Sequence, residues 1–236
     1  MSAVLTHHLE PLAPYLADEA VREIVVNEPG EIGVEDARGW RWIDDGRLTM
    51  RWLMTLARAA AAHTGQDVSA ATPICSTSLP DGARCQIVLP PAASNISLTI
   101  RRPMGVTPRL SALIDGGLFN GVDKHAAGVD ARLDALRTQG EWGGFFMRAV
   151  EARRTILISG ATGSGKTTLA RALCVYIPDH ERLVTIEDTR ELDLHHRNCV
   201  HLTWAREGQG MAKLGPGDLL AAALRMRPDH PPRGGA

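Results

Sequence analysis

One glycine-rich segment constrains this chain more than any other. Residues 160–167 read Gly-Ala-Thr-Gly-Ser-Gly-Lys-Thr and meet the spacing GxxxxGK[ST] of a phosphate-binding loop, called the P-loop below. The apolar run Thr155–Ser159 precedes it, and a helical pattern over Lys166–Tyr176 follows, which is the strand-loop-helix context that the motif requires. This context predicts an α/β fold with a parallel sheet, in which Thr155–Ser159 is a buried strand.

The P-loop predicts binding of ATP or a close relative. Its glycines let the backbone turn tightly enough for successive N–H groups to face phosphate oxygens, and the helix N-terminus adds partial positive charge. We expect Lys166 to reach the β and γ phosphates and the Thr167 hydroxyl to coordinate Mg²⁺. A glycine-rich turn without a ligand is the alternative. The residues expected at the nucleotide are Gly160, Ala161, Thr162, Gly163, Ser164, Gly165, Lys166, Thr167 and Thr168.

Two adjacent carboxylates follow a second apolar run. Residues 182–188 predict a further parallel strand that ends in Glu187 and Asp188. Ligands of open α/β sheets gather at the carboxyl ends of the strands, so both side chains are candidates for catalysis, as water-positioning groups, and Glu187 for the metal. The alternative is an acidic strand end that serves as a helix cap or a solvated turn.

Residues 1–102 carry the pattern of a small α+β domain. Alternating runs over Glu23–Asp44 predict a meander of short strands, with Trp40 and Trp42 packed on one face rather than forming a base-stacking platform. Apolar residues at helical spacing over Arg47–His63 predict one amphipathic helix. Further strands are expected at residues 75–79, 85–89 and 97–102.

Glycine and proline interrupt the pattern after the small domain. Residues 103–140 are therefore expected to be a linker with short helices, and residues 141–236 a P-loop domain that opens with a helix over Trp142–Arg153. The adjacent pairs His7-His8 and His195-His196 diverge on any regular element and are expected at the surface.

Composition excludes several classes of protein. The formal net charge of −1 gives no broad footprint for nucleic acid, so direct binding of DNA or RNA is not predicted. No run of about 18 apolar residues and no signal peptide pattern occurs, so a cytoplasmic location is expected. The four cysteines lack CxxC spacing and are expected to be reduced, partly buried thiols.

Several segments of the chain together match one known family. These segments are Gly160–Thr168, Ile177-Pro178 and Glu181–Leu192, with Leu12–Asp18, Glu23–Glu31, Leu79–Ile87 and Leu98–Pro103 upstream. Through them the chain resembles the VirB-eleven-like traffic ATPases of type IV secretion, which belong to the secretion-superfamily P-loop ATPases. The Asn27–Gly30 entry and the absence of a paired CxxC insertion favour this group over its pilus and type II secretion relatives.

The resemblance implies a hexameric ring, peripheral to the cytoplasmic face of a bacterial inner membrane, that works with channel components of a secretion system. It implies that ATP hydrolysis powers pilus assembly and the export of DNA or protein. Arg84 and Arg101 match arginines that approach the phosphates in the family. By strand alternation Arg101 shares a face with Thr99 and could act as an arginine finger, whereas solvated or surface-paired arginines are the alternative.

The C-terminal segment departs from the family pattern. After Leu224–Asp229 the family continues into an apolar strand ending in Gly-Glu, the Walker B element, whereas this sequence reads His-Pro-Pro-Arg-Gly-Gly-Ala. Consecutive prolines cannot form a central strand. The expectation is a truncated P-loop sheet with impaired hydrolysis, and a non-catalytic nucleotide-binding remnant is the alternative to an active motor.

Overall fold

The computed structural model describes residues 3–103, 109–118, 122–205 and 210–229. They divide into two compact units: residues 1–103 together with 179–236, called the sheet unit, and residues 104–178, called the P-loop unit. Residues 179–236 thus belong with the N-terminal residues in this division. The domain boundaries at residues 102 and 140 remain predictions.

A six-stranded antiparallel sheet forms the centre of the sheet unit. Its strand order is β3-β2-β1-β6-β5-β4, and β1, β2 and β3 form the predicted meander. Gly30 turns the chain between β1 and β2 with φ +93°, a conformation that glycine adopts without a Cβ clash. The bounds are β1 Glu23–Val26, β2 Glu31–Asp36, β3 Gly39–Asp44, β4 Ile74–Ser78, β5 Arg84–Val88 and β6 Ser97–Arg101.

One face of this sheet carries the larger hydrophobic core. Strand alternation places Ile24, Ile100 and Cys85 in one row, and they pack with buried residues of helix α3, Met50–His63. The Thr49 side chain caps α3 by accepting a hydrogen bond from the Trp52 N–H at 3.2 Å. The short helices on this side are α1 Ala3–His8, the 3-10 helix Glu10–Leu12 and α2 Ala13–Ala17.

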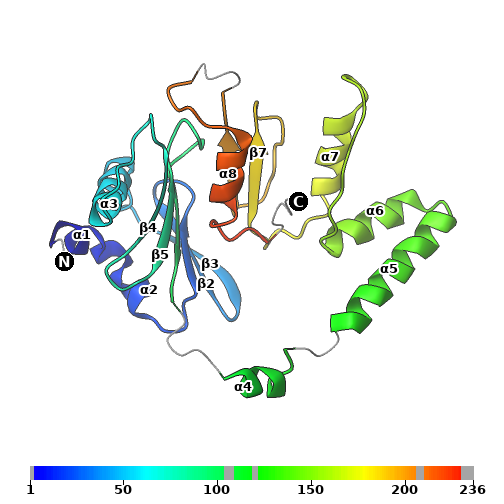
Figure 1. Cartoon of the computed structure of the whole chain (residues 1–236), viewed down its shortest axis with the longest axis horizontal. Helices are drawn as coiled ribbons and strands as arrows, with labels where there is room; N and C mark the ends of the chain where they lie inside the picture. The colour runs from blue at the N-terminus through cyan, green and yellow to red at the C-terminus, as the bar shows by residue number, and fades with distance from the viewer. Residues whose placement is uncertain (1–2, 104–108, 119–121, 206–209, 230–236) are drawn as a thin grey trace. The chain divides into compact units, whose positions relative to one another are not determined.

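The opposite face of the sheet is covered by the C-terminal elements. Strand β7, Leu183–Glu187, pairs in parallel with β8, Cys199–Thr203, and helix α8, Pro216–Ala223, follows. A second core joins Val88 of β5 to buried residues of β8 and α8. Figure 1 shows α3 on one side of the antiparallel sheet and α8 and β7 on the other.

The regular elements in the described part of the P-loop unit are helices. Its helices are α4 Leu110–Asp115, α5 Val122–Thr138, α6 Trp142–Glu151 and α7 Lys166–Cys174. The predicted helices before and after the P-loop are confirmed as α6 and α7. Within the residues that we expected to be a linker with short helices, α5 runs for 17 residues.

The predicted strand Thr155–Ser159 is not a strand in the structure, and Leu157 is 91% exposed. A central strand is stable only when neighbouring strands take up its N–H and C=O groups, and no described segment pairs with these residues. We expected an incomplete parallel sheet that contains the strand before the P-loop, whereas within the described ranges the parallel pairing is confined to β7 and β8.

Two further expectations concern the C-terminal tail and membrane-spanning helices. The tail that departs from the family pattern, residues 230–236, lies outside the described residues. None of the helices in the described part of the chain combines the length and the apolar character that crossing a bilayer requires.

Candidate functional site

The P-loop forms a tight turn that opens helix α7. Gly163 and Gly165 have φ values of +80° and +86°, which only glycine adopts readily, and Gly165 is the N-cap of the helix. A Cβ on Gly160 would lie 2.6 Å from the Ser164 Oγ, so the loop closes on itself where a side chain would intrude. These positions explain why the motif needs glycine there.

Lys166 lies over this turn at the first position of α7. Its ammonium donates hydrogen bonds to the carbonyl oxygens of Gly160 and Ala161 at 2.9 and 2.8 Å. Residues 160–165 are exposed, and Thr167 is half-buried beside them. A cationic side chain, a helix N-terminus and an exposed glycine turn therefore meet at one place, and they fit the phosphates of a nucleotide.

Glu187 ends strand β7, as predicted, and its carboxylate organises the next turn. Oε2 accepts hydrogen bonds from the backbone N–H groups of Glu191 and Leu192 at 2.7 and 2.8 Å. Burial alone would raise the pKa of Glu187, but these amides and the Thr185 hydroxyl outweigh it and hold the pKa below its usual range. Glu187 is thus an ionised acceptor of fixed orientation.

Asp188 follows at the carboxyl end of the same strand. Its Oδ1 accepts a hydrogen bond from the Thr189 N–H at 2.9 Å, and the residue lines a pocket of about 370 Å³ with Thr203 and Trp204. The structure therefore places both predicted carboxylates at the strand ends of the sheet unit, while Lys166 belongs to the P-loop unit.

Arg84 and Arg101 lie directly opposite each other on neighbouring strands β5 and β6. Glu23 of β1 is the next residue in the same row, and the guanidinium of Arg101 forms an ion pair with its carboxylate. Glu23 is 3% exposed, whereas the Arg101 side chain is 58% exposed and Arg84 is also exposed. The two predicted arginines therefore share one end of the sheet face, together with a buried carboxylate.

The sequence reasoning missed Arg182, the residue before β7. Its side chain is fully buried, and burial lowers its pKa to about 10. It donates hydrogen bonds to the Met226 carbonyl at 2.7 Å and to three side chains of the same unit. Those acceptors are Asn27 Oδ1 at 2.8 Å, Asn198 Oδ1 at 2.5 Å and Thr99 Oγ1 at 3.1 Å.

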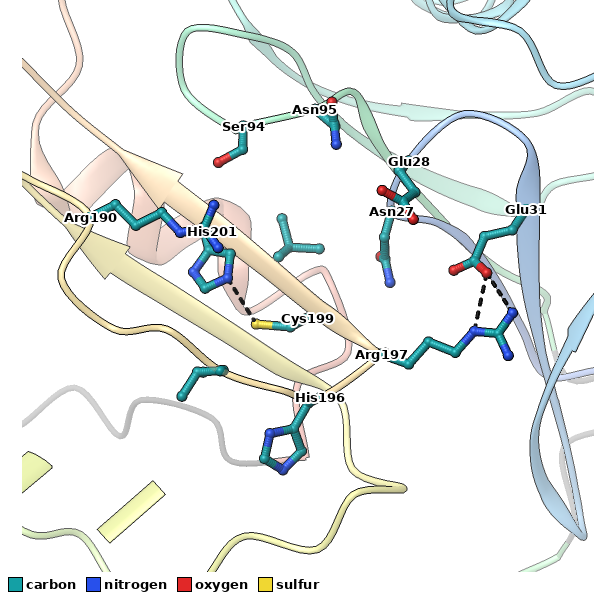
Figure 2. Close-up of a pocket in the computed structure, with 12 residues that line it drawn as sticks. Asn27, Glu28, Glu31, Ser94, Asn95, Arg190, His196, Arg197, Cys199 and His201 are labelled. Carbon is teal, nitrogen blue, oxygen red and sulfur yellow. Dashed lines mark hydrogen bonds and ion pairs between the residues drawn. The ribbon is translucent and has the colours of Figure 1, made fainter. Parts of the chain in front are cut away.

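A second pocket, of about 350 Å³, lies within the sheet unit at the start of β8 (Figure 2). Cys199 and His201 line it, and their Sγ and Nε2 atoms are 3.6 Å apart. The prediction that the histidine pairs lie at the surface is wrong for His196, which also lines this pocket and is 9% exposed. The alternating spacing of Cys199 and His201 on one strand was the signal that could have found this pair.

Comparison with known proteins decides the family. The model of the family described as "Type II/IV secretion system protein" matches residues 6–230. The chain belongs to this family. Type IV secretion system proteins of the family are similar over nearly its whole length, among them VirB11 of Bartonella henselae, 40% identical over 97% of this chain and 68% of the relative. PtlH of Bordetella pertussis is 43% identical over 96% of this chain and 68% of its own length.

The solved structures include a member of the same family. The crystal structure of the VirB11 ATPase from the Brucella suis type IV secretion system, in complex with sulphate, superposes with a TM-score of 0.87 at 39% identity. The matched region covers 96% of this chain and 67% of the Brucella chain. The fold is therefore the α/β fold of the P-loop secretion ATPases, and the resemblance deduced from the sequence is confirmed.

Proposed function

We propose that this chain is an ATP-binding traffic ATPase of a type IV secretion system. The observation that carries the proposal is the P-loop turn with the Lys166 ammonium held over it at the start of α7. The similarity to VirB11 and PtlH supports type IV secretion in place of a pilus or type II secretion role. In this proposal the protein acts at the cytoplasmic face of the inner membrane, in a ring with other copies and with secretion-channel components.

The P-loop residues bind the phosphates of ATP and stabilise the charge on them. The N–H groups of the P-loop bind phosphate oxygens, and Lys166 exchanges its two carbonyl partners for the β and γ phosphates. Thr167 and Glu187 would hold Mg²⁺, which neutralises developing charge on the phosphates when it is bound. Each residue offers an oxygen atom, the ligand type that magnesium takes in addition to substrate phosphates.

The carboxylates and arginines of the sheet unit act on the attacking water and on the transferred phosphate. Glu187 or Asp188 orients the attacking water, and Arg84 and Arg101 supply guanidinium groups to the charge that develops on the transferred phosphate. Arg84 is the more available of the two, because Arg101 is paired with Glu23.

ATP turnover and nucleotide binding, measured side by side on the purified chain, test this function. We expect Lys166→Ala to lower turnover by about 100-fold or more, because the ammonium stabilises charge in the transition state. Lys213→Ala, at an exposed position outside the P-loop, is the matched control and should leave turnover unchanged. Nucleotide binding without any turnover of the unsubstituted chain would favour the non-catalytic remnant, and no binding of Mg-ATP at millimolar concentration would refute both.

A further inference from the structure

The pocket at the start of β8 holds a thiol and an imidazole in contact. Cys199 and His201 are two residues apart on one strand, so their side chains project from the same face. The Cys199 Sγ lies 3.6 Å from the His201 Nε2, and the dashed line in Figure 2 joins these atoms. Cys199 is half-buried and lines the pocket of about 350 Å³, so its sulfur borders a space that a small substituent can fill.

The other ring nitrogen of His201 is engaged on the far side. Nδ1 lies 2.9 Å from the Thr185 Oγ1, and the carboxylate oxygen Oε1 of Glu187 lies 3.9 Å from Nδ1. A proton on Nδ1 donates to the Thr185 hydroxyl oxygen and leaves Nε2 as the lone-pair nitrogen that faces the thiol. Cys199, His201 and Thr185 are therefore arranged as a nucleophile, a base and a group that orients the base, the arrangement found around activated cysteines.

Two cationic side chains line the pocket beside this pair. Figure 2 shows the Arg190 side chain extended toward His201. Arg190 and Arg197 line the pocket, and cations near a sulfur stabilise its thiolate.

We propose that Cys199 is an activated thiol, with His201 as its general base, and that low-molecular-weight disulfides modify it inside this pocket. His201 Nε2 takes the thiol proton, the Cys199 Sγ attacks one sulfur of the disulfide, and the sulfur–sulfur bond of that molecule breaks. A mixed disulfide forms on Cys199, and the departing thiolate receives the proton from the imidazolium. The chemistry needs no nucleotide, so its test can fail or succeed independently of the proposed ATPase function.

The remaining cysteines provide comparisons within the same chain. Cys85 is buried, and burial raises its pKa to about 12, while burial also raises the pKa of Cys75. Both should stay unmodified. Cys174, at the end of α7, is half-buried like Cys199 and is the matched reference for accessibility.

The test follows glutathione disulfide incorporation at each cysteine of the full chain by peptide mass spectrometry at pH 7. We expect Cys199 to react at least about tenfold faster than Cys174, and His201→Gln to slow Cys199 at least about tenfold without changing Cys174. Cys174→Ser should leave the Cys199 rate unchanged. A Cys199 rate at or below that of Cys174, or no effect in a folded His201→Gln protein, would overturn the proposal.

A second variant keeps the test decisive if His201→Gln does not fold. Thr185→Val keeps the side-chain shape and removes the hydroxyl that orients the imidazole, so the Cys199 rate should fall while circular dichroism stays native. An unchanged Cys199 rate in a folded Thr185→Val protein would contradict the assignment of His201 as an oriented base.

Discussion

Glu23 is a carboxylate that folding removes from water. It is 3% exposed, and burial raises its pKa, although the hydrogen bond and the charge of Arg101 act in the opposite direction. Burial raises the pKa of Glu35, its neighbour across the sheet, in the same way. A carboxyl group with a raised folded pKa binds its proton more tightly in the folded state. Its contribution to stability is therefore lost as the pH rises from about 4.5 through the folded pKa.

This reasoning predicts that Glu23→Gln flattens the pH dependence of stability. Urea unfolding between pH 4.5 and pH 7 should show a smaller loss of stability with rising pH than the unsubstituted chain, because the amide carries no charge to bury. The exposed substitution Glu19→Gln is the control and should retain the original slope. An identical slope in Glu23→Gln would contradict the prediction. Below pH 4.5 Glu187 contributes with the opposite sign, since its pKa is held down.

At the scale of elements, the β2–β3 hairpin joins the sheet to the C-terminal segment through its tryptophans. Trp40 and Trp42 stack with ring centroids 6.3 Å apart, as the alternate spacing predicted. The Arg197 guanidinium lies 5.1 Å from the Trp42 ring centroid, and that of Arg227 lies 5.5 Å from the Trp40 centroid. Gly33 lies opposite Trp42, where a side chain would displace the ring.

Gly33→Ala should therefore destabilise the chain. Its Cβ would lie 2.7 Å from the Val25 Cγ2 and 2.8 Å from the Trp42 Cζ3, and such overpacking costs about 1–3 kcal/mol. Urea unfolding measures the loss, and Gly46→Ala, where no atom lies within 4 Å of the added methyl group, is the control. A loss of unfolding free energy in Gly33→Ala no larger than that in Gly46→Ala would show that the hairpin accommodates the added methyl group without cost.

At the scale of the whole sheet unit, Arg182 connects segments that are far apart in the sequence. Its guanidinium bonds Asn27 and Thr99 of the N-terminal part and Asn198 of the C-terminal part. Its backbone N–H also donates to the Asp229 Oδ2 at 2.7 Å. A buried cation with several hydrogen-bond acceptors is tolerated, whereas its loss leaves these acceptors without their donor.

Arg182→Met should lower the free energy of unfolding by about 3–5 kcal/mol, because several buried polar groups lose their partner at once. Arg182→Lys should recover little of this free energy, since a single ammonium group cannot reproduce the planar set of hydrogen-bond donors of a guanidinium. Denaturant unfolding measures both, and Arg58→Met on the exposed side of α3 should stay within about 0.5 kcal/mol. A loss below about 1 kcal/mol in Arg182→Met would show that the site rehydrates.

Features with a local cause could be predicted from the sequence. The turn of the P-loop follows from glycines that need positive φ, and α3 follows from the apolar residues at helical spacing over Arg47–His63. The face of Arg101 follows from strand alternation. Each of these depends on a few consecutive residues and on backbone sterics, which act before any tertiary contact forms.

Features that need a partner distant in the sequence were decided only by the tertiary structure. An apolar pattern predicted a strand over Thr155–Ser159, yet no described segment pairs with it, so the pattern alone did not make it one. Arg182 is buried because Asn27, Thr99 and Asn198 come together around it, although arginine is usually exposed. The setting of Cys199 and His201 likewise depends on Thr185 of the neighbouring strand. Local geometry and family membership could thus be deduced from the amino-acid order, whereas burial and the partners of charged groups arise only when distant segments exclude water together.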